Sequence, residues 1–169
     1  MDELSRGILR ELLPQEKEVV PPPVKTNRAP NPMDHWSLAV LRERGEYLGK
    51  LAKHGDGSAG ETLKEFPGHA AMLSFRGRDG QAEVHENFAD LFYVLGGRAA
   101  LLTGGTVPGA KTVAPGEMRG DAIEGGTRQE LRPGDLAHVP AGLPHQMLVA
   151  SDRAVTCFVL KIAKVEEKS

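Results

Sequence analysis

The sequence predicts an all-β fold, a closed or two-sheet antiparallel domain, preceded by a helical extension. Beyond about residue 68, short apolar runs alternate with turns such as Arg132-Pro133-Gly134-Asp135, a pattern typical of β-sandwiches and barrels. The 20 glycines and 12 prolines agree with many turns, and 169 residues with 40% hydrophobic side chains are enough for one domain with its own core. The candidate strands are 69–76, 81–86, 90–95, 98–103, 117–123, 127–131, 135–139, 145–150 and 154–163.

The first 60 residues have a different, helical pattern. Apolar residues recur at helical spacing over 3–13, and Pro14 ends that short amphipathic helix. A second helix is expected to start at Asp34 as its cap and to end at Gly55, with residues 55–60 as a flexible link. We therefore expect residues 1–60 to form a helical extension and linker, and residues 61–169 to form the β-barrel domain.

Charge and composition exclude several classes of function. A net charge of −2 offers no basic face for nucleic acid, and no run of 18 apolar residues could span a membrane. The N-terminal Met1-Asp2-Glu3-Leu4 is acidic and lacks a signal core, so we expect a cytoplasmic protein. The lone Cys157 lies in an apolar run and is interpreted as a buried, inert thiol rather than a nucleophile.

Two spaced motifs bring together residues that can bind a metal. Glu83 and His85 are two apart on a candidate strand, so both side chains point to the same face. Asp90 begins the next strand and can lie opposite His85 in a hairpin, while a Pro- and Gly-containing turn can direct His145 into the same space. Two imidazoles with one or two carboxylates are a donor set for Fe(II), Mn(II) or Zn(II). The motifs read Gly77-x5-Glu83-x-His85-x4-Asp90-x6-Gly97 and Gly134-x5-Pro140-x-Gly142-x2-His145.

These stretches resemble the two motifs of the cupin superfamily, over roughly residues 68–163. The resemblance implies a double-stranded β-helix barrel, or jelly roll, with a ligand pocket inside. The chain departs from the family pattern in three places: Glu83 replaces the first His, Asp90 replaces a Glu, and Val149 replaces an Asn. A register with His85 and Asn87 as the His pair is rejected, because it shortens the gap to Asp90 and puts Asp79 at the position of Gly77.

The predicted metal ligands are therefore Glu83, His85, Asp90 and His145. A barrel that has lost its metal is the alternative, yet each altered position keeps a side chain able to bind one. His138 is expected to share an inward face with Leu136 and to move a proton, or else to be a histidine of the wall without a chemical role.

The sequence also predicts which neighbouring residues line the pocket and which do not. Phe92 and Val94 are in register with Asp90 and are expected to line the pocket, whereas Gln146 should point away from it. The segment from Gly104 to Thr127 is long for a hairpin and rich in charge, so it is either a cover over the barrel mouth or a solvated loop.

We expect an enzyme that uses one divalent metal ion, Fe, Mn or Zn, on a small oxygen-bearing organic substrate. The resemblance allows dioxygenase, decarboxylase, isomerase and lyase chemistry, and it allows a homodimer. The first alternative is a cupin that binds or senses a small molecule without turnover. The second is a structural barrel that serves assembly.

Overall fold

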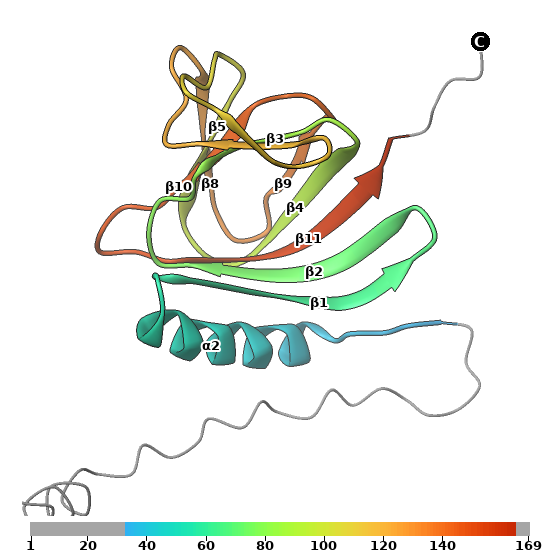
Figure 1. Cartoon of the computed structure of the whole chain (residues 1–169). Coiled ribbons are helices and arrows are strands. Elements are labelled where there is room, and N and C mark those ends of the chain that lie inside the picture. Colours follow the sequence, from blue (N-terminus) through green and yellow to red (C-terminus); the bar gives the residue numbers. More distant parts are fainter. Residues whose placement is uncertain (1–32, 165–169) are drawn as a thin grey trace, which may run out of the picture.

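The computed structural model describes residues 33–164, which form one helix packed on a two-sheet β-barrel (Figure 1). The helix predicted over 3–13 lies outside the described residues. No described helix is long and apolar enough to cross a membrane. The elements are α2 (Leu38–His54), β1 (Ser58–Phe66), β2 (His69–Arg76), β3 (Ala82–His85), β4 (Phe88–Gly97), β5 (Ala99–Thr103), β6 (Lys111–Ala114), β7 (Glu117–Gly120), β8 (Thr127–Leu131), β9 (Leu136–Val139), β10 (His145–Leu148) and β11 (Val155–Ala163).

The strands form two antiparallel sheets, as the sequence predicted. One sheet has the order β1-β2-β11-β4-β9 and the other has the order β6-β7-β3-β10-β5-β8. Consecutive strands often lie in different sheets, which is the arrangement of a jelly-roll barrel. Alternate side chains of each sheet point inward, so one continuous apolar core fills the end of the barrel around Val94, Leu101, Val139, Met147 and Val155.

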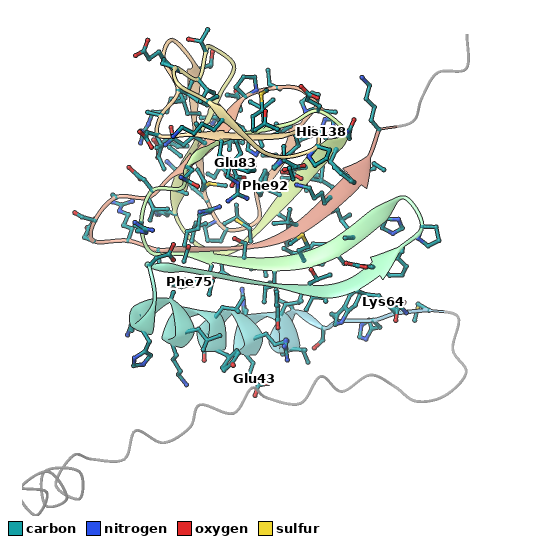
Figure 2. All side chains as sticks on the ribbon, viewed as in Figure 1. Glu43, Lys64, Phe75, Glu83, Phe92 and His138 are labelled. Carbon is teal, nitrogen blue, oxygen red and sulfur yellow. The ribbon has the colours of Figure 1, made fainter. Side chains whose placement is uncertain are left out.

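A second apolar cluster joins helix α2 to the outer face of the first sheet. Leu41 and Leu48 of the helix pack with Leu73 and Phe75 of β2, and Figure 2 shows Phe75 on the helix side of the sheet. Each such buried side chain contributes about 1.5–3 kcal/mol to folding. Gly45 allows this contact, because a Cβ there would lie only 2.7 Å from Cγ2 of Thr156.

The start of the helix differs from the prediction. Ser37, not Asp34, is the N-cap, and its hydroxyl accepts a hydrogen bond from the backbone N–H of Val40 at 3.3 Å. The Asp34 carboxylate instead pairs with Lys64 of β1 at 2.6 Å. Asp34 therefore forms an ion pair with a distant strand instead of capping the helix, as the sequence spacing had predicted it would.

Strand β1 was not predicted, since its sequence has few apolar or β-branched residues. It is the edge strand of its sheet, where polar side chains are tolerated because one side faces solvent. It begins at Ser58, so residues 58–60 pair with β2 rather than form a flexible link. The proposed boundary between residues 60 and 61 therefore falls inside this strand.

Candidate metal centre

The candidate metal centre is built around β3, which brings other strands to its inward-facing residues. Glu83 and His85 occupy alternate positions and both line the same cavity. Glu83 lies opposite His145 of β10 on one side and opposite Arg119 of β7 on the other. His85 lies opposite Glu117 of β7. The antiparallel register therefore gathers residues that are far apart in the chain.

The donor atoms lie at spacings suited to one metal ion. Nε2 of His85 is 3.5 Å from Oε2 of Glu83 and 3.3 Å from Oδ2 of Asp90. Nε2 of His145 is 4.0 Å from the same Glu83 oxygen and 3.5 Å from the same Asp90 oxygen. Two atoms bound to one ion at about 2.1 Å lie about 3.0 Å apart at a right angle and about 3.4 Å apart at a tetrahedral angle. The ligand atoms of Glu83, His85 and His145 all lie within 4.8 Å of one another.

Both imidazoles have their Nδ1 atoms engaged, which leaves Nε2 facing the cavity. His85 Nδ1 bonds the Glu117 carboxylate, and His145 Nδ1 lies 3.3 Å from the carbonyl oxygen of Leu143. This is the tautomer that metal-binding histidines need, with the second nitrogen held by an oxygen. Nε2 of His145 and Oδ1 of Asp90 are buried without a hydrogen-bond partner in the described chain. The side chains therefore fit a cation better than they fit an empty, protein-only cluster.

The electrostatics of the cluster favour a bound positive charge. Burial lowers the pKa of His85, but hydrogen bonds to Asp90 and Glu83 outweigh it and raise that pKa to about 9. Burial raises the pKa of Asp90, yet the neighbouring imidazoles of His145 and His85 and the charge of Lys161 lower it well below its usual range. The carboxylates thus remain ionised and hold a proton on His85 when no metal takes that place.

The centre opens into a cavity of about 220 Å³ inside the barrel, where Figure 2 shows Glu83 and Phe92. Phe92 lines this cavity as predicted, with its ring centroid 6.1 Å from that of His145. Val94 does not, because it lies two residues further along β4, within the apolar core. Gln146 points away from the cavity, as expected, and its amide bonds the backbone oxygens of Gly80 and Asp121.

The inward orientation expected for His138 is wrong. His138 and Leu136 are exposed on the outer face of β9, and the intervening residue Ala137 packs against the core. Val139, which lies opposite Asp90, is the inward neighbour of His138. Regular alternation therefore turns the His138 imidazole away from the cavity, which it does not line.

Sequence reasoning did not identify Glu117 as a partner of a metal ligand. It lies in the charged segment between the motifs, which contains β7 within the predicted strand 117–123 and also the unpredicted strand β6. The spacing Glu117-x-Arg119 could have indicated this, because residues two apart on a strand share a face and both of these line the cavity. Only the register of β7 against β3 shows which carboxylate meets His85.

Comparisons with known proteins support the fold. No protein-family model and no curated protein matches the chain, but solved structures do. The structure of the DMSP lyase DddQ from Ruegeria pomeroyi DSS-3 matches with a TM-score of 0.53 and 19% identity, covering 95% of this chain and 85% of that one. The protein TT1209 from Thermus thermophilus matches with a TM-score of 0.49 and 20% identity, covering 70% and 95%. A cupin-2 domain from Rhodospirillum rubrum matches with a TM-score of 0.46 and 17% identity, covering 66% and 63%.

The class of fold follows from the two-sheet barrel and agrees with the likeness to the DMSP lyase structure. The chain has a double-stranded β-helix fold, as the resemblance of its two motifs to the cupin superfamily predicted. At this identity the likeness concerns the fold alone, so function is argued from the site.

Proposed function

We propose that this protein is a metal-dependent enzyme that acts on a small, oxygen-bearing organic substrate inside the barrel. The proposal rests on a buried cluster in which the Nε2 atoms of two imidazoles lie close to two carboxylates. Within this cluster, His145 Nε2 has no hydrogen-bond partner among the described residues. His85 and His145 would be the central ligands, and Asp90 and Glu83 would complete the set.

The two carboxylates have different surroundings and, we propose, different roles. Asp90 is the better placed ligand, because one of its oxygens lies within 3.5 Å of both Nε2 atoms. Glu83 is more exposed and is 3.4 Å from the long side chain of Arg119, so it can also accept a proton from a bound substrate. Burial raises the pKa of Glu83, but the hydrogen bond to His85 and the charges of Arg119 and Arg76 lower it further, so the carboxylate is ionised and able to bind a cation.

A bound divalent ion would supply Lewis-acid polarisation of a substrate oxygen, or a site for O2 in the case of iron. Carboxylate and imidazole donors suit Fe(II), Mn(II) and Zn(II) better than Cu(I). The chain itself would orient the substrate against Phe92 and exclude water on the apolar side of the cavity. A cavity of about 220 Å³ lies below the usual range for ligand pockets, which favours a small substrate.

Elemental analysis of protein purified without a metal-affinity tag tests the proposal. We expect about one Fe, Mn or Zn per chain in the parent protein and a large loss in His85→Ala and His145→Ala. His138→Ala is the matched control, because it removes an exposed imidazole of the same barrel. A parent without metal after growth in Fe, Mn and Zn, or full metal content in both site variants, would contradict the proposal.

Turnover separates the enzyme from a cupin that only binds a ligand. The metal-loaded protein should convert at least one member of a panel of small oxygen-bearing compounds, and His145→Ala should not. DMSP belongs in this panel, since it is named for one structural match. Stable retention of a ligand without product from any compound would support the binding or sensing alternative.

A further inference from the structure

The charged groups of the cavity are unevenly paired. Three of its carboxylates have partners: Asp90 lies 3.8 Å from Lys161, Glu83 lies 3.4 Å from Arg119, and Glu117 bonds His85. The remaining cation, Arg76, lines the same cavity, but its guanidinium makes no hydrogen bond or ion pair with a side chain of the described residues and acts on Glu83 only through its charge.

This pairing fixes the sign of charge that the cavity can accept. Three carboxylates balance the charges of two arginines and one lysine, so a divalent ion held by neutral imidazoles leaves the cavity with a surplus of two positive charges. A surplus of this kind in a small, partly apolar space attracts anions. The missing partner of Arg76 is therefore expected from outside the chain.

The alternation of β2 places Arg76 on the cavity side of its sheet, where it lines both this cavity and an adjoining pocket that Gly80 also lines. Met72, Ser74 and Arg76 line the cavity, as does Leu73, while Leu73 and Phe75 also belong to the apolar cluster with helix α2. The guanidinium is half-buried and rests against the backbone of Gly80, where an added Cβ would lie 2.9 Å from Nη1 of Arg76. Gly80 thus leaves the space that the guanidinium occupies.

We propose that Arg76 is the specificity-determining residue that binds a carboxylate of the substrate, which is a small organic acid. The inference rests on the proposed function and deepens it, because a second oxygen of the same acid would approach the metal ligands across the cavity. A guanidinium suits this task, since its planar N–H groups can bind both oxygens of a carboxylate. Arg119 and Lys161 are less suited, because Glu83 and Asp90 already engage them.

Calorimetric titration of the full-length, metal-loaded protein tests this role. The probes are malonate, succinate and glutarate, with succinamide as the uncharged analogue of succinate, in buffer free of carboxylates. We expect at least one diacid to bind, succinamide to bind far more weakly, and Arg76→Gln to weaken the diacid by about 10-fold or more. Arg78→Gln is the matched control, because Arg78 is two residues away, exposed, and paired with Asp56 at 2.9 Å outside the cavity.

Two further variants guard against a merely structural effect. Arg76→Lys keeps the charge and should recover part of the lost affinity. Gly80→Ala keeps Arg76 but forces its guanidinium to move, and it should also weaken the diacid. Both variants should keep the metal content and the melting temperature of the parent.

The outcomes distinguish this inference from the proposed function. If Arg76→Gln binds every diacid within about 3-fold of the parent, or if the parent binds none, the role of Arg76 is overturned while the metal result stands. If the parent contains no metal, the proposed function fails, and the same titrations of metal-free parent and Arg76→Gln decide the role of Arg76 alone.

Discussion

Removal of the Glu117 carboxylate should weaken metal binding although Glu117 is not itself one of the proposed ligands. Its carboxylate bonds Nδ1 of His85 and so keeps Nε2 directed at Asp90, 3.3 Å away. Partners of this kind typically contribute 10- to 100-fold to metal affinity, which is about 1.4–2.8 kcal/mol. We expect Glu117→Ala to lose affinity in that range.

Glu117→Gln should have a smaller effect, because its amide oxygen can still accept the hydrogen bond and only the charge is lost. A loss of about 3- to 10-fold follows from the lower strength of a neutral hydrogen bond. Metal affinity should therefore fall from the parent to Glu117→Gln and further to Glu117→Ala. The first step measures the effect of the carboxylate charge on the imidazole, and the second measures the effect of orienting it.

Competition of Zn²⁺ or Mn²⁺ binding with a chromogenic chelator measures these affinities. Glu124→Ala is the control, because Glu124 is an exposed acid on the same segment, outside the cavity. Metal affinity of Glu117→Ala within about 3-fold of the parent, with unchanged folding, would refute the argument that Glu117 orients His85.

Three other outcomes test the packing, the thiol and the pH dependence. Gly45→Val should lower the free energy of unfolding by about 1–3 kcal/mol in urea titrations, because its side chain would overlap Thr156; a change under about 0.5 kcal/mol would show that the helix shifts freely. Cys157 should resist iodoacetamide at pH 8 in the native protein and react in 6 M guanidinium (about the strongest practical denaturant), because burial raises its pKa to about 12; rapid native labelling would contradict the buried position. The rise in melting temperature caused by metal should be larger at pH 8 than at pH 6, because protons compete with metal for His85 at all pH values below its raised pKa of about 9. The protonated imidazole also stabilises the metal-free protein, and this stabilisation is complete below about pH 6.5 and lost above about pH 9. Equal rises at the two pH values would contradict that competition.

The two motifs allowed much of the centre to be predicted from local spacing. Glu83 and His85 share a face because side chains alternate in any strand, and Gly97 tolerates its positive φ of 79° where a Cβ would meet the carbonyl oxygen of Ala154 at 1.9 Å. The same rule failed for His138 only because alternation gives the two faces of a strand but not which of them is inward. Leu136 suggested the inner face, yet it is 62% exposed.

The sequence by itself determined the antiparallel barrel, the buried Cys157 and the pair His85 and His145, since each depends on patterns within a short stretch of chain. Only the tertiary structure decided the partners of those residues. Glu117 meets His85 through the register of β7 on β3. The Arg76 guanidinium makes no hydrogen bond or ion pair with a side chain of the described residues, whereas Arg119 and Lys161 pair with Glu83 and Asp90. Such pairings depend on which strands lie side by side, and that is a property of the whole barrel rather than of any one motif.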